Sequence, residues 1–167
     1  MARSLEKLHV IIYYYKTFTI ILLFVFDELK MFTAETNIRV RYAETDQMGV
    51  VYYGNYATYY EVARVEALRQ IGLTYKGLEK EGILMPVVEL KTKYIRPAKY
   101  DDLLTVKTYI HALPESRIIF NYEVFNEAEV LINTGETTLV FIDKTNGRPC
   151  HAPHEVANLL KPYFNEE

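Results

Sequence analysis

The spacing of apolar residues along the chain predicts one strand, then one long helix, and then a series of strands. Residues 38–42 alternate between apolar residues and arginine, which predicts a strand. Residues 55–71 repeat aromatic and small apolar side chains every three or four positions, so we expect one long and largely buried helix. Asn55 is the expected N-cap of this helix, and Gly72 is its expected C′ residue.

Beyond a short helix expected over 75–81, the pattern becomes almost purely strand-like. Long alternating runs occupy residues 88–94, 104–110, 118–124 and 130–142. A tight turn at 126–129 joins the last two runs, and a terminal helix is expected over 153–164. A single long helix followed by such a sheet predicts an α+β fold, in which at least five antiparallel strands curl round the helix. The outer face of the sheet is then either solvated or paired with another subunit.

Residues 1–30 have a different composition from the rest of the chain. The apolar and aromatic run over 10–26 is at the lower limit of length for a membrane helix, and no small-x-small cleavage site follows it. Because the later residues read as a complete domain, one interpretation is an upstream extension with the true start at Met31. A membrane anchor and a packed helix are the alternatives. We therefore expect an N-terminal extension over 1–30 and one domain over 31–167.

Composition excludes several classes of function. A net charge of −3 argues against a protein that binds nucleic acid through a basic surface. A single cysteine excludes an internal disulfide and suits a reducing compartment, so we expect a cytoplasmic protein. Neither of the two serines lies in a Gly-x-Ser-x-Gly motif, and phosphate-binding and dinucleotide-binding glycine motifs are absent. Cys150, His151 and His154 lie close together, but the flanking prolines indicate a loop, so no metal site is expected.

Residues 42–66 hold the most unusual combination of side chains. Asp46 follows the first strand, where a carboxylate can attack a carbonyl carbon or deprotonate water. The helix begins near Tyr53, Gly54 and Asn55, and free N–H groups at a helix start can stabilise a developing oxyanion. Gly54 leaves room for a ligand there. In the alternative interpretation, Asp46 only organises a turn and Asn55 only caps the helix.

The same stretch resembles the signature of a known enzyme family. The resemblance rests on Asp46, Gly49, Val50-Val51, Tyr52-Tyr53 and Asn55-Tyr56, with a Tyr-Tyr-Glu-x-Ala-Arg-x-Glu continuation over 59–66 and Tyr-Ile-Arg-Pro-Ala at 94–98. These residues resemble the 4-hydroxybenzoyl-CoA thioesterases of the hotdog fold, and in particular the short-chain acyl-CoA thioesterases found beside the Tol-Pal envelope system. The likeness runs from about residue 37 to 164. It implies a helix wrapped by a curled antiparallel sheet.

The resemblance also implies roles for individual residues. Asp46 becomes the nucleophile or general base of thioester hydrolysis, and the backbone N–H of Tyr53 becomes the donor that polarises the carbonyl. The Tol-Pal-associated branch often has histidine where this chain has Tyr53, so any role of that imidazole is absent here. Coenzyme A carries phosphates that need a local cationic patch, for which the candidates are Lys91, Lys93 and Arg96 along one strand and its exit, with Arg117 at the start of a later strand. In the alternative interpretation, the strand lysines only solvate the outer face of the sheet. The expected substrate contacts are Gly54, Asn55, Lys93 and Arg96.

The expected substrate is therefore an acyl-CoA or an acyl carrier protein thioester, with no separate cofactor. A homodimer or homotetramer is expected, because the family builds each active site at a subunit interface. The alternative function is a non-catalytic acyl-binding or scaffolding protein of the same fold. A dehydratase of this fold is disfavoured, because those enzymes use histidine and residues 42–66 contain none.

Overall fold

The computed structural model describes residues 30–164, so nearly all of the extension expected over 1–30 lies outside the described residues. The elements are β1 (Phe32–Arg39), η1 (Tyr42–Glu44), α2 (Asn55–Gln70), α3 (Tyr75–Lys80), β2 (Ile83–Leu84), β3 (Val87–Tyr94), β4 (Leu103–Ile110), β5 (Arg117–Phe125), β6 (Leu131–Val140), β7 (Ile142–Asp143), β8 (Arg148–Pro149), α4 (His154–Leu160) and η2 (Lys161–Tyr163). Within residues 30–164, no helix has the length and apolar character needed to cross a membrane.

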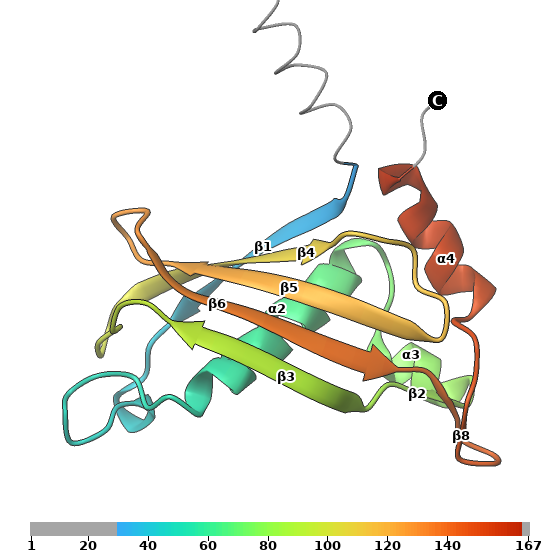
Figure 1. Cartoon of the computed structure of the whole chain (residues 1–167), viewed down its shortest axis with the longest axis horizontal. Coiled ribbons are helices and arrows are strands. Elements are labelled where there is room, and N and C mark those ends of the chain that lie inside the picture. The colour runs from blue at the N-terminus through green and yellow to red at the C-terminus, as the bar shows by residue number, and fades with distance from the viewer. Residues whose placement is uncertain (1–29, 165–167) are drawn as a thin grey trace, which may run out of the picture. The chain divides into compact units, whose positions relative to one another are not determined.

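The main layer is a five-stranded antiparallel sheet in the order β1-β4-β5-β6-β3, so β1 and β3 are its edges. A small sheet of β2, β7 and β8 lies beyond one end of α2 (Figure 1). α2 packs along one face of the main sheet, which curls round it. This arrangement confirms the expected α+β fold with a central helix and at least five strands.

The first expected strand is shifted. β1 ends at Arg39, and the chain then turns through η1, where the Glu44 N–H donates to the Arg41 carbonyl at 3.0 Å. Tyr42 is therefore 79% exposed and does not lie on the apolar face of a strand. Alternation alone cannot reveal this turn, because a 3₁₀ turn of three residues is too short to change the period visibly.

Of the two predicted ends of the long helix, the first is wrong and the second is confirmed. The expected N-cap is wrong, because Gly54 is the cap and Asn55 is the first helical residue. The C′ position of Gly72 is confirmed by its φ of +85°, which a residue without Cβ adopts easily. The Leu73 and Gly72 N–H groups donate back to Leu68 and Arg69 carbonyls at 2.9 Å each, which completes a Schellman motif.

The core between α2 and the sheet is unusually rich in tyrosine. The Tyr60 ring from α2 stacks on the Tyr122 ring from β5, with centroids 4.4 Å apart and an interplanar angle of 11°. The Tyr60 hydroxyl lies 2.9 Å from the Thr92 hydroxyl and donates to Asn133. A Cβ at Gly135 of β6 would overlap the Tyr60 ring, so this glycine is what allows the helix to approach the sheet.

These buried tyrosines predict a loss of stability in alkali. Burial raises the pKa of Tyr56 and of Tyr60 to about 12, whereas an unfolded chain releases a tyrosine proton near pH 10. Below pH 10 both states hold the proton, so stability is unaffected. As the pH rises from about 10 towards 12, the unfolded state loses protons first and the folded state loses stability. Circular dichroism melts should show a falling Tm over this range, with a shallower fall for Tyr60→Phe. An equally steep fall in that variant would contradict the assignment.

Candidate active site

The segment that follows η1 forms a short, tight hairpin. Thr45 and Val51 pair across it as an antiparallel bridge, and the Asp46 N–H donates to the Val50 carbonyl at 2.9 Å. The Gly49 N–H donates back to the Asp46 carbonyl at 2.9 Å, with the Gly49 φ at +74°. The loop therefore presents Asp46 in one defined position at an end of the sheet.

The carboxylate of Asp46 has one hydrogen-bond partner among residues 30–164. The Met48 N–H donates to Asp46 Oδ1 at 2.8 Å, which is the local turn geometry expected in the alternative interpretation. Oδ2 accepts no bond within the described part of the chain. The turn therefore holds Oδ1, whereas Oδ2 stays available to act as a nucleophile or base. The turn-forming and the catalytic interpretations of Asp46 are therefore compatible.

The start of α2 supplies amide donors. The Asn55 N–H donates to the Tyr52 carbonyl at 2.9 Å. Within residues 30–164, the N–H groups of Tyr53 and Gly54 donate to no acceptor. Because they precede a helix of 16 residues, they lie at its positive end. Such donors can stabilise negative charge on an oxygen atom.

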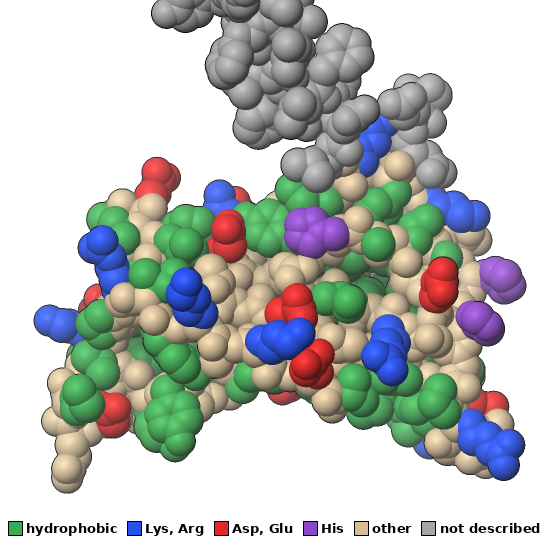
Figure 2. All heavy atoms as spheres, viewed as in Figure 1, with side chains coloured by type: hydrophobic (Ala, Val, Ile, Leu, Met, Phe, Trp, Pro, Cys, Tyr) green, Lys and Arg blue, Asp and Glu red, His purple; other side chains and the backbone are tan. Residues whose placement is uncertain are grey.

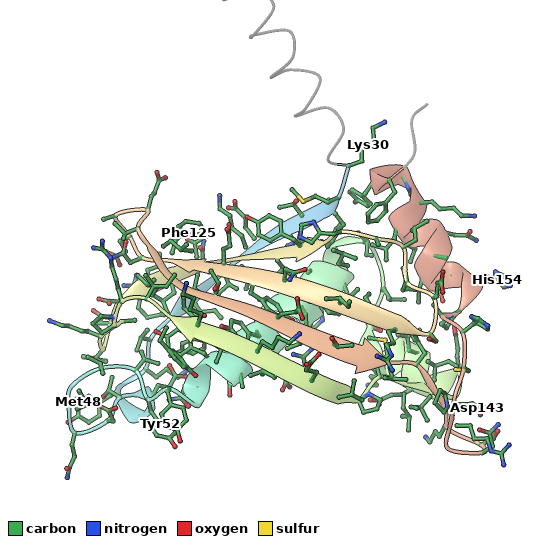
Figure 3. All side chains as sticks on the ribbon, in the orientation of Figure 1. Lys30, Met48, Tyr52, Phe125, Asp143 and His154 are labelled. Carbon is green, nitrogen blue, oxygen red and sulfur yellow. The ribbon has the colours of Figure 1, made fainter. Side chains whose placement is uncertain are left out.

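Hydrogen bonds to Glu44 connect the Asp46 loop to this helix start. The Glu44 carbonyl accepts from the Tyr52 N–H at 2.9 Å and from the Asn55 side-chain amide at 2.7 Å. Asp46 and Tyr53 are therefore brought to the same corner of the molecule, where Figure 3 labels the neighbouring Met48 and Tyr52. The Asn55 side chain, expected to contact substrate, is engaged with Glu44.

Aromatic side chains line this corner. The Tyr53 ring lies 4.4 Å from the Tyr52 ring and 6.4 Å from the Tyr94 ring, measured between centroids. The Tyr94 hydroxyl donates to the Tyr53 carbonyl at 3.2 Å. A Cβ at Gly54 would lie 2.7 Å from the exposed Tyr52 ring, so the missing side chain accommodates this ring in the free protein.

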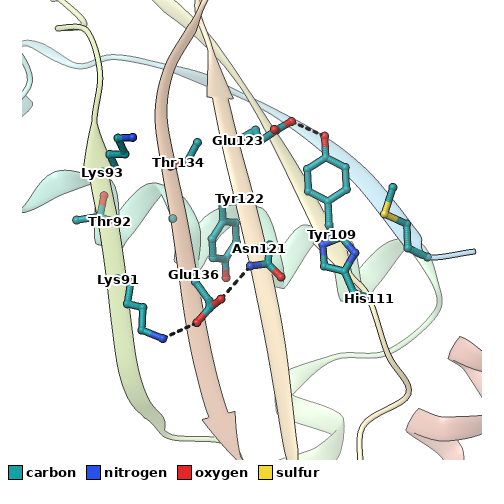
Figure 4. Close-up of a pocket in the computed structure, with 12 residues that line it drawn as sticks. Lys91, Thr92, Lys93, Tyr109, His111, Asn121, Tyr122, Glu123, Thr134 and Glu136 are labelled. Atoms are coloured by element: carbon teal, nitrogen blue, oxygen red, sulfur yellow. Dashed lines mark hydrogen bonds and ion pairs between the residues drawn. The ribbon is translucent and has the colours of Figure 1, made fainter. Parts of the chain in front are cut away.

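The two expected cationic contacts lie on and just after β3, and the segment after β3 meets the Asp46 hairpin where the Val51 N–H donates to the Ala98 carbonyl at 2.8 Å. Lys93 lies on β3 and lines a hollow of ≈ 620 Å³ on the outer face of the sheet (Figure 4). Arg96 is exposed in the segment after β3, where its N–H donates to the Ile132 carbonyl at 3.0 Å. Neither side chain is paired with another residue of the described chain, so both remain available to an anion.

Several other polar groups of the outer hollow are bonded to one another. Lys91 Nζ lies 2.9 Å from Glu136, the Asn121 amide donates to Glu136 at 3.1 Å, and the Tyr109 hydroxyl donates to Glu123 at 2.7 Å (Figure 4). Figure 2 shows basic and acidic side chains interspersed over this face. Neither Asp46 nor Tyr53 lines it. Among residues 30–164, no three His, Cys, Asp or Glu side chains are grouped to bind a metal ion.

Sequence reasoning missed Glu44. Its carboxylate is 13% exposed and is bonded to the Tyr59 hydroxyl at 2.9 Å and to the Arg41 N–H at 2.8 Å. The one available signal was its place two residues before Asp46, inside the stretch that resembles the family signature. A pattern of spacing cannot show which carboxylates are buried by distant residues.

Known proteins match most of this chain. The acyl-CoA thioester hydrolase YbgC of Escherichia coli O6:H1 is 31% identical over 124 residues, which are 74% of this chain and 92% of that protein. The acyl-CoA thioesterase YbgC of Haemophilus influenzae is 32% identical over 120 residues, 71% and 88% of the two chains. The crystal structure of DHNA-CoA thioesterase from Staphylococcus aureus has a TM-score of 0.69 and 40% identity, and covers 71% of this chain and 80% of that one.

These similarities confirm the hotdog fold and the family expected from the Asp46 motif. The match to the family itself extends over residues 40–160, which include both the Asp46 loop and the whole of the main helix. The chain belongs to the Thioesterase-like superfamily.

Proposed function

We propose that this protein hydrolyses acyl-CoA thioesters to a carboxylic acid and free coenzyme A. The protein is a thioester hydrolase by its family and its relatives. The acyl-CoA class comes from these relatives. The observation that carries the hydrolytic mechanism is that Asp46, with one carboxylate oxygen unbonded, and the unbonded amide donors at the start of α2 are held in one corner by Glu44.

In this proposal the thioester carbonyl oxygen lies at the Tyr53 N–H. As the carbonyl carbon becomes tetrahedral, negative charge grows on that oxygen, and the N–H and the helix dipole stabilise it. Asp46 acts by one of two routes. Its carboxylate attacks the carbonyl carbon and the C–S bond breaks to give an anhydride that water then hydrolyses, or it removes a proton from water, whose oxygen attacks instead. The thiolate leaves and takes up a proton in either case.

The phosphates of coenzyme A need cations, and Lys93 and Arg96 are the proposed contacts. The support is that both side chains are unpaired within residues 30–164, whereas Lys91 is engaged with Glu89 and Glu136. The chemistry uses groups of the chain, the substrate and water alone, so the proposal includes no cofactor. We expect the protein in the cytoplasm, where acyl-CoA is made and used.

Thiol release from a series of acyl-CoA chain lengths, and from acyl carrier protein thioesters, tests this function. We expect turnover of acyl-CoA, with the chain-length profile identifying the acyl group. Turnover of carrier-protein thioesters alone would move the substrate assignment to that class. Tight acyl-CoA binding without thiol release would favour the non-catalytic acyl-binding alternative.

We also propose that the active unit is a homodimer, which can pair again to a tetramer. The edge strand β3 exposes apolar side chains, with Val88 at 56% and Leu90 at 42%, and an exposed apolar edge is a site for association. Tyr94 at the end of β3 contacts Tyr53, so a second copy on this edge would also approach the Asp46 corner.

Light scattering should therefore give at least twice the chain mass of 19.6 kDa. Leu90→Glu places charge on the edge and is expected to yield the monomer, because a buried unpaired carboxylate disfavours association. Val62→Glu, at an exposed position on α2, is the control and should leave the dimer intact. A monomeric wild type at micromolar concentration would contradict this proposal.

A further inference from the structure

Glu44 has all of its polar groups in hydrogen bonds, although it has no part in the chemistry proposed above. Its N–H donates to the Arg41 carbonyl, and its carbonyl accepts from Tyr52 and Asn55. Its Oε2 accepts from the Arg41 N–H at 2.8 Å and from the Tyr59 hydroxyl at 2.9 Å, and Oε1 lies 3.4 Å from Arg41 Nη1. A carboxylate held from so many directions, at 13% exposure, is fixed in place.

The partners of Glu44 come from separate parts of the fold. Arg41 belongs to the exit from β1, Tyr52 to the segment just before α2, and Tyr59 to the second turn of α2. Tyr59 is 1% exposed, so its hydroxyl has no access to solvent and depends on the carboxylate as its partner. The Glu44 side chain therefore attaches the η1 turn to the helix, and its carbonyl attaches the same turn to the helix start.

The two proposed reacting groups lie on either side of this attachment. Asp46 is two residues after Glu44, and Tyr53 follows Tyr52, the residue whose N–H the Glu44 carbonyl accepts. The separation of the Asp46 carboxylate from the Tyr53 N–H is consequently set by two features together, the Thr45–Val51 bridge of the hairpin and the seating of Glu44 on α2. A displacement of about 1 Å between reacting groups can cost about 10²-fold in rate.

We infer that Glu44 and Tyr59 form a clamp that positions Asp46 against the helix-start donors, so that both are positioning residues for thioester hydrolysis. The inference rests on the proposed function. Removal of the clamp should lower kcat and leave KM nearly unchanged, because neither Glu44 nor Tyr59 bonds to the proposed coenzyme contacts Lys93 and Arg96.

The sheet offers a matched control for this clamp. Tyr109 of β4 donates its hydroxyl to Glu123 of β5 at 2.7 Å, a tyrosine–carboxylate bond of the same kind on the outer face, away from α2. Tyr59→Phe and Tyr109→Phe each delete one hydroxyl from one such bond. Both keep the ring, so the folded protein should survive either change with a Tm lower by a few degrees at most.

Steady-state thiol release by the full chain compares these variants. We expect kcat to fall about tenfold in Tyr59→Phe, with KM within about twofold of the wild type, and to stay unchanged in Tyr109→Phe. The kcat of Glu44→Ala should be lower still. The double variant Glu44→Ala/Tyr59→Phe should have the same kcat as Glu44→Ala, because both changes remove the same bond. A double variant whose loss of kcat equals the product of the two single losses would show that Tyr59 acts independently of Glu44.

The outcomes separate this inference from the proposed function. An active wild type with equal kcat in Tyr59→Phe and Tyr109→Phe would overturn the clamp and leave the function standing. A rise in KM alone would assign Tyr59 to substrate binding and also overturn it. A folded wild type without thioesterase activity would refute the proposed function itself.

Discussion

Replacement of Asp46 by asparagine is expected to lower kcat for acyl-CoA hydrolysis by about 10²–10⁴-fold, the usual contribution of one general base or nucleophile. Asparagine keeps the size of the side chain and can still accept the Met48 N–H with its amide oxygen. It can neither attack the carbonyl carbon nor accept a proton from water. Initial rates of thiol release, with circular dichroism to verify folding, measure the effect, and substrate binding should change little.

The alternative is that Asp46 serves the turn alone. Asp143 provides the control, because its Oδ1 accepts the Thr145 N–H at 2.8 Å in the same two-residue pattern. Asp143→Asn should keep wild-type kcat. Tyr53→Phe should also be mild, since the proposed donor is the backbone N–H and not the hydroxyl. Near wild-type turnover in Asp46→Asn would reject the catalytic role and favour the acyl-binding alternative.

The second large effect is on stability. Gly135→Ala is expected to destabilise the fold by about 3 kcal/mol, the upper part of the range for an overpacked core. The new Cβ would overlap the Tyr60 ring, which cannot move aside because it stacks on Tyr122 and is bonded to Thr92 and Asn133. Thermal melts should show a Tm lower by about 6–12 °C for a chain of this size.

Gly54→Ala is the matched control for this effect. Its Cβ would also meet a tyrosine ring, at 2.7 Å, but Tyr52 is 44% exposed and can turn away. The Gly54 φ of −66° suits alanine as well as glycine, so backbone strain is not added. We expect a change within about 0.5 kcal/mol, as for most exposed positions. Equal losses of stability in Gly135→Ala and Gly54→Ala would show that the mobility of the neighbouring tyrosine ring does not determine the cost of the added Cβ.

Much of the fold could be predicted because its periodic signals are long. The helix over 55–71 differs from α2 by one residue at its end, and each long alternating run contains or overlaps an observed strand. The run over 130–142 breaks at Phe141, whose N–H bonds to the Ser116 carbonyl at 3.1 Å. Such a break depends on a distant partner, so no local pattern could show it.

The candidate site was less accessible to sequence reasoning. Asp46 and Tyr53 could be proposed because they lie seven residues apart, between an expected strand and an expected helix, in a stretch that carries a family signature. The hydrogen bond from Asn55 to Glu44 could not be predicted, because asparagine is equally suited to capping a helix. Alternation placed Lys93 on the sheet. Arg96 lies beyond the strand, where the period of the sequence does not show which way a side chain points. The substrate contacts of both residues stay predictions.

Multiple-turnover release of coenzyme A thiol tests the central claim most directly. Purified full chain and Asp46→Asn are given the same acyl-CoA in excess, and free thiol is followed per mole of chain. The account predicts many equivalents from the wild type and a rate at least about 10²-fold lower from the variant. Release of no thiol by the wild type, or equal rates from the two proteins, would contradict it.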